Sequence, residues 1–88
     1  SSRDALLAGV RALEGEFPGR FHLLPSATNF ITLRMPDGER LYQYLGGQGI
    51  AIRYTGGLVR ITCGAPEENQ AVLREMSSYF AATPAVEE

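Results

Sequence analysis

The sequence predicts a two-layer α/β (α+β) sandwich in the order α-β-β-α-β-β-α, with helices covering one face of a small, mainly antiparallel sheet. Two observations support this. Three segments carry apolar residues at three- and four-residue spacing, which indicates amphipathic helices. Other segments alternate apolar and polar residues, as half-buried strands do, and Gly and Pro separate the segments. With 88 residues the chain suits one small domain with a modest core.

Each predicted helix has one apolar side. In residues 3–17 that side consists of Leu6, Leu7, Val10, Leu13 and Phe17. The second helix is expected to begin at Asp37, which is placed to accept a backbone N–H as an N-cap, and to end at Gly46, Gly47 and Gly49. The third begins after Gly64 with Pro66 in its first turn. Its buried side is expected to contain Val72, Leu73, Met76 and Phe80.

Four strands are expected between the helices. The first is a short one from Arg20 to Pro25, and the second runs from Asn29 to Met35. The third and fourth are Ile50 to Thr55 and Leu58 to Cys63. Residues 81–88 show no periodicity, so we expect a frayed tail there and assign the domain to residues 1–80.

Two glycines determine how the last two strands pair. Gly56 and Gly57 suit a two-residue turn in which both central residues take positive φ. This turn pairs Arg53 with Arg60, and Ile50 with Cys63. Both arginines then lie on the sheet face opposite the helices. A four-residue loop would shift the register by two and leave both on that face, and only a bulge would separate them. Facing like charges destabilise a sheet by about 0.2–1 kcal/mol, whereas an anion between them reverses the effect, because guanidinium groups match carboxylate and phosphate. The alternative is that each arginine is solvated or pairs with a neighbouring acid.

Composition excludes several kinds of function. All eight basic residues are arginines, so the chain cannot form a Schiff base through a lysine. Only one histidine and one cysteine are present, without a partner at metal-ligand spacing. A net charge of −2 argues against general nucleic-acid binding. A single cysteine and the lack of a signal-like or membrane-spanning apolar segment favour the cytoplasm.

Other residues that could carry chemistry have simpler interpretations. We expect His22 to be exposed or satisfied rather than catalytic, and Cys63 to be a small core residue. The glycines at 46–49 follow a helix rather than precede one, so they indicate a helix end and not a phosphate loop. The tyrosines at 42, 44 and 54 are interpreted as packing residues.

Three motifs resemble a known family. These are SATNFITLR (residues 26–34), GIAIR (49–53) and VRITCGAPEEN (59–69). In content and spacing they resemble the C-terminal small domain of histidinol-phosphate aminotransferases. These are class I/II, fold-type I enzymes that use pyridoxal phosphate. The resemblance extends from about Leu6 to Phe80.

The resemblance implies a role for particular residues. Arg60 matches the family's arginine that grips the substrate's carboxylate or acidic group, and Arg53 matches a second arginine at the substrate's phosphate end. Asn29 matches an asparagine that looks structural. The family's cofactor and its lysine belong to a large domain, so the resemblance implies a domain of a longer, homodimeric enzyme that is inactive alone. The implied reaction transfers an amino group between histidinol phosphate and 2-oxoglutarate.

Two alternatives stay open at this point. One is a related enzyme with the same small domain, such as a phosphothreonine decarboxylase or an aromatic or other amino-acid aminotransferase. The other is a free-standing regulatory α/β module that binds an anionic amino acid and performs no chemistry.

Overall fold

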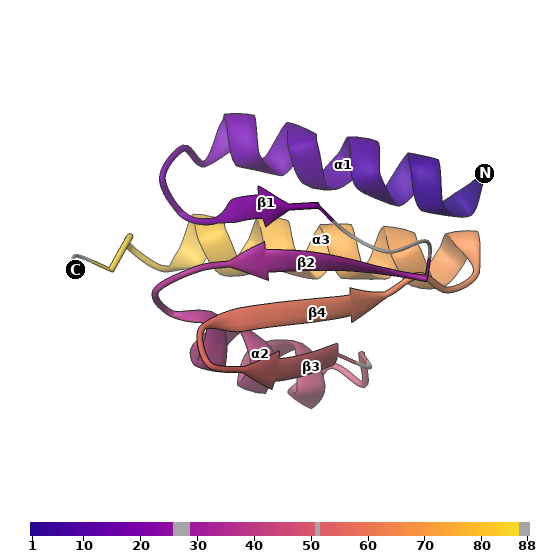
Figure 1. Ribbon diagram of the computed structural model, residues 1–88. Coiled ribbons are helices and arrows are strands. Elements are labelled where there is room, and N and C mark those ends of the chain that lie inside the picture. The colour runs from indigo at the N-terminus through magenta and orange to yellow at the C-terminus, as the bar shows by residue number, and fades with distance from the viewer. Residues whose placement is uncertain (26–28, 51, 87–88) are drawn as a thin grey trace.

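The chain folds in the predicted order of helices and strands (Figure 1). A computed structural model describes residues 1–25, 29–50 and 52–86, and within them it contains three helices and four strands. In chain order these are α1 (Ser2–Glu16), β1 (His22–Leu24), β2 (Phe30–Arg34), α2 (Gly38–Gly47), β3 (Ile52–Thr55), β4 (Leu58–Thr62) and α3 (Pro66–Ala82).

The four strands form one sheet in the order β1-β2-β4-β3, and every neighbouring pair is antiparallel. Figure 1 looks onto the uncovered face, with α2 and α3 behind the strands and α1 running alongside β1. Helix α1 packs against α3 and β1, and α2 packs against β3, β4 and α3. The predicted sandwich, with helices on one face of the sheet, is therefore confirmed.

The core lies between the sheet and the helices. Along β2, Ile31 and Leu33 are fully buried, while Thr32 between them faces the other side. Strand β4 alternates in the same way, with Val59 and Ile61 buried. The buried apolar side chains are Leu6, Val10, Leu13, Phe21, Ile31, Leu33, Met35, Leu41, Leu45, Val59, Ile61, Val72, Met76, Tyr79 and Phe80. The apolar periodicity thus identified most of the core correctly.

Two predicted strands begin two residues later than expected, whereas the bounds of the other two differ by at most one residue at either end. Strand β1 begins at His22 rather than Arg20, because the Arg20 side chain turns into the interior. Strand β3 begins at Ile52. The amide of Ile50 instead donates to the carbonyl of Leu45 at 3.1 Å and completes the end of α2. The predicted pairing of Ile50 with Cys63 is therefore wrong, and residue 51 lies outside the described residues.

Helix α3 extends further than its apolar periodicity indicated. It continues to Ala82, two residues past Phe80, and the backbone carbonyl of Thr83 accepts a hydrogen bond from Arg20 at 2.8 Å. The expected frayed tail therefore does not begin at residue 81. Residues 87 and 88 of that predicted tail lie outside the described residues.

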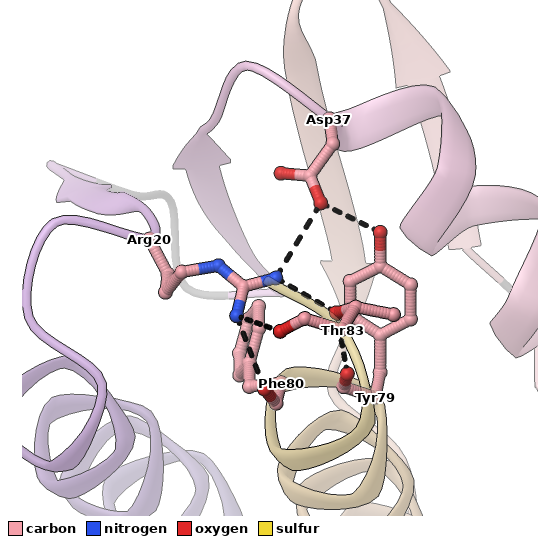
Figure 2. A network of polar contacts seen from close by, with 5 residues as sticks. All are labelled: Arg20, Asp37, Tyr79, Phe80 and Thr83. Carbon is pink, nitrogen blue, oxygen red and sulfur yellow. Dashed lines mark hydrogen bonds and ion pairs between the residues drawn. The ribbon is translucent and has the colours of Figure 1, made fainter. Parts of the chain in front are cut away.

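A buried polar network joins the α1–β1 connection, the start of α2 and the end of α3 (Figure 2). Arg20 and Asp37 are each 6% exposed and form an ion pair at 3.6 Å. The Tyr79 hydroxyl donates to Asp37 Oδ2 at 2.6 Å. The Arg20 guanidinium also donates to the carbonyl of Phe80 at 3.1 Å and to Thr83, and its Cζ lies 5.0 Å from the centroid of the Phe80 ring.

This network explains why Asp37 does not behave as predicted. It occupies the N-cap position of α2, but its carboxylate makes no capping hydrogen bond. The carboxylate instead points inward to Arg20 and Tyr79. A buried carboxylate needs a cation and donors more than a helix end exposed to water needs a cap. Asp37 therefore occupies the N-cap position, as predicted, but the predicted capping hydrogen bond from its side chain is wrong.

The network also raises the pKa of Tyr79 to about 12. Burial is the main cause, followed by the hydrogen bond to Asp37. In the unfolded chain the hydroxyl ionises near pH 10, so in the folded chain it keeps its proton over a wider range. The stability that this proton provides is fully present below pH 10 and is lost as the pH rises toward 12.

Replacing Tyr79→Phe tests the network. We expect the free energy of unfolding at pH 7 to fall by about 1.5–3 kcal/mol, because a hydrogen bond to a buried charged group is removed. Between pH 10 and 12, the wild type should lose stability more steeply than the variant. Urea unfolding followed by circular dichroism measures both effects. The exposed Tyr42→Phe serves as the control, and equal losses in the two variants would contradict the prediction.

Gly38 tests the packing of α2 on the sheet. A Cβ at this position would lie 3.0 Å from Val59 Cγ2 and 3.1 Å from Tyr54 Cε1, so Gly38→Ala should destabilise the chain by about 1–3 kcal/mol. Gly46→Ala, in the same helix with open space around it, should instead stabilise by about 0.5–1 kcal/mol. Both values come from the same denaturation experiment. A stabilising Gly38→Ala would show that α2 does not approach the sheet this closely.

Candidate functional site: the uncovered sheet face

The turn between β3 and β4 fixes the register of the candidate site. Gly56 has φ of 55° and Gly57 has φ of 86°, as a two-residue turn of this kind requires. The register pairs Thr55 with Leu58 and Arg53 with Arg60. Both arginines are exposed on the face away from the helices. The predicted register and the predicted side of the two arginines are confirmed.

The uncovered face is cationic. None of the four strands contains an acidic residue, although the whole chain has ten. Besides Arg53 and Arg60, the face carries Arg34 of β2, directly opposite His22 of β1. Three of the eight arginines therefore gather on one sheet face of a chain whose net charge is negative. The scattered order of the arginines along the sequence did not indicate this gathering.

A depression of about 270 Å³ lies between the two facing arginines. Its lining consists of Thr32, Arg53, Thr55, Leu58 and Arg60. Two guanidinium groups offer several N–H donors in planar forks, which match the oxygens of carboxylate or phosphate. Threonine hydroxyls can add neutral hydrogen bonds. Chemically, this arrangement is suited to bind a small anion.

Arg60 has an aromatic neighbour on the adjacent strand. Its Cζ lies 4.2 Å from the centroid of the Phe30 ring. Phe30 lies on the same face of β2 as Thr32, and no motif in the sequence indicated a role for it. The contact crosses from β2 to β4, and only the order of strands in the sheet brings these two residues together. A favourable cation–π contact of this kind needs the cation within about 6 Å of the ring centroid.

The remaining candidate residues do not line the depression between Arg53 and Arg60. His22 is exposed, and Cys63 is partly buried against the core, as the sequence predicted. Among the described residues, no three His, Cys, Asp or Glu side chains lie close enough together to hold a metal ion. In the part of the chain that the structure describes, no helix is sufficiently long and apolar to cross a membrane.

The uncovered face does not fit pyridoxal phosphate as a resident cofactor. That cofactor is normally held as an imine on a lysine, and the chain has no lysine. The groups that the face does offer are guanidinium and hydroxyl groups, which recognise anions. The face thus offers groups suited to bind an anion, and the chain lacks the lysine on which this cofactor is held.

The chain is similar in sequence to histidinol-phosphate aminotransferases. It is 39% identical to histidinol-phosphate aminotransferase 1 of Pseudomonas aeruginosa over 79 residues, which is 82% of this chain and 21% of that protein. It is 34% identical to the enzyme of Pseudomonas syringae over 85 residues, or 88% of this chain and 24% of that protein. It is 38% identical to the enzyme of Chromobacterium violaceum over 63 residues, which is 64% of this chain and 18% of that protein. No family model matches the chain.

A solved structure has the same fold. A protein of Burkholderia pseudomallei assigned as an aminotransferase superposes with a TM-score of 0.74 at 23% sequence identity. The match covers 90% of this chain and 24% of that one. The chain thus spans about a fifth to a quarter of the length of these proteins. The resemblance that the three motifs indicated, to the histidinol-phosphate aminotransferases, is confirmed over most of the chain.

Proposed function

We propose that this chain is the substrate-binding small domain of a longer pyridoxal-phosphate-dependent aminotransferase of the histidinol-phosphate type. The enzyme would transfer an amino group between histidinol phosphate and 2-oxoglutarate. The observation that carries the proposal is the facing pair Arg53 and Arg60, on a sheet face whose strands contain no acid. Both substrates are anions, one with a phosphate and the other with two carboxylates. The sequence similarity to named enzymes of this type supports the same assignment.

In this proposal the two arginines have different tasks. Arg60 binds the carboxylate or other acidic group of the substrate, and Arg53 binds near the phosphate end. A bound anion also relieves the repulsion between the two facing cations, so binding and local stability are coupled. Fixing the anionic ends of the substrate orients its reacting centre, and correct orientation is a large part of what a binding residue contributes to rate.

The chemistry itself would belong to the rest of the protein. The cofactor supplies the electronic chemistry of amino transfer when bound, and a large domain beyond this chain would hold it. We therefore propose that the 88-residue chain alone is inactive, that its own large domain is its principal partner, and that the whole enzyme is a cytoplasmic homodimer. Neither nucleic acid nor membrane is a proposed partner.

Arg60→Ala in the full-length enzyme tests the leading assignment. We expect KM for the anionic substrate to rise about 10- to 100-fold, because charge-assisted hydrogen bonds are lost. Steady-state kinetics with histidinol phosphate and 2-oxoglutarate measure the effect. Arg74→Ala is the control, since Arg74 lies on α3 with 69% of its side chain exposed, and its KM should not change. An unchanged KM in Arg60→Ala would overturn the assignment.

Arg53→Ala tests the division of tasks between the arginines. If Arg53 binds the phosphate end, its loss should raise KM for histidinol phosphate about tenfold and change KM for 2-oxoglutarate much less. The same kinetic assay, with each substrate varied in turn, provides the comparison. Equal effects on both substrates would show that Arg53 contributes only general positive charge.

A further inference from the structure

We propose that Phe30 is a positioning residue for Arg60: its ring holds the guanidinium from one side so that the N–H donors point to the substrate anion. This inference deepens the proposed function and rests on it. The geometric basis is the distance of 4.2 Å from Arg60 Cζ to the centroid of the Phe30 ring. The proposal concerns orientation of the binding group, and Phe30 itself need not touch substrate.

The ring is held on a rigid support. Phe30 is the first residue of β2 and pairs with Thr62. Arg60 lies two residues before Thr62 on β4, opposite Thr32. The amide of Cys63 donates to the carbonyl of Asn29 at 3.0 Å, so the ladder between the strands continues past Phe30. Phe30 is half-buried. Sites built on paired strands hold side chains more precisely than sites on loops.

The ring also lies on the side of Arg60 that faces away from Arg53. Strand β4 lies between β2 and β3. Arg53 on β3 therefore repels the guanidinium from one side, and the negative face of the Phe30 ring attracts it from the other. Both effects displace Arg60 toward Phe30. Without the ring, facing like charges would spread over several rotamers, and each rotamer lost on binding reduces affinity.

An aromatic ring holds an arginine without using its donors. A carboxylate partner would occupy the planar fork of the guanidinium, and that fork is also what a substrate carboxylate needs. Within the described residues no hydrogen bond or ion pair joins an acid to Arg60, and its strand and the neighbouring strands carry no acid. The contact with the ring occupies none of the N–H donors with an acceptor, so they stay available for an incoming planar carboxylate.

The proposal is tested in the full-length enzyme with Phe30→Leu, Phe30→Tyr, Arg60→Ala and the double variant Phe30→Leu/Arg60→Ala. Phe30→Leu should raise KM for the carboxylate substrate about three- to tenfold with kcat nearly unchanged, from the loss of the cation–π contact. Phe30→Tyr keeps the aromatic face and should retain the wild-type KM. In the Arg60→Ala background, Phe30→Leu should have no further effect.

Phe17→Leu is the matched control. Phe17 is also half-buried, but its ring packs 5.5 Å from that of Phe80, in the core and away from the uncovered face. It reproduces the loss of packing without touching Arg60, so its KM should equal that of the wild type.

The outcomes separate this proposal from the proposed function. If Arg60→Ala leaves KM unchanged, the proposed function and the role of Phe30 both fail. If Arg60→Ala raises KM but Phe30→Leu does not, only the role of Phe30 fails. The role of Phe30 is also overturned if Phe30→Leu raises KM equally in the Arg60→Ala background, because the ring then acts through another group. A rise in KM of the same size in Phe17→Leu would likewise assign the effect to packing and overturn the role of Phe30.

Discussion

The register of the β3–β4 hairpin is the constraint on which the candidate site depends. Gly56 and Gly57 close the turn with two residues at positive φ, and a two-residue turn leaves no freedom in how the strands pair. Side chains alternate along a strand, so a slip of one residue would exchange the two faces of β3. Arg53 would then point into the helical layer, and Ile52 would be exposed. The turn thus determines that both arginines share the uncovered face.

The buried network of Arg20, Asp37 and Tyr79 stabilises the helical layer rather than the uncovered face. It ties the α1–β1 connection, the start of α2 and the end of α3 to one another. A buried ion pair of this kind contributes little net stability relative to apolar packing, but removing one partner is costly. Its effect is to hold the ends of three elements together behind the sheet. The network residues do not include Arg53 or Arg60 of the uncovered face.

Charge is divided between the two layers of the molecule. Among the described residues the acids lie on helices and connections, while the strands carry only cationic, neutral polar and apolar residues. The net charge of −2 therefore does not describe the field at the uncovered face. A small anion approaching that face meets arginines from two neighbouring strands. This separation of charge is the structural basis of the proposal that the face binds an anionic substrate.

The sequence by itself determined the order of elements, most of the core and the facing of Arg53 and Arg60. These follow from local rules: apolar spacing selects helix or strand, and two glycines select a turn. Only the tertiary structure decided that Phe30 meets Arg60 and that Arg20 and Asp37 are buried partners. Arg20 resembled a strand residue and Asp37 a helix cap, because local preference is all that a short stretch of sequence expresses. Which strands become neighbours, and which buried charges then need each other, depends on contacts between segments far apart in the chain.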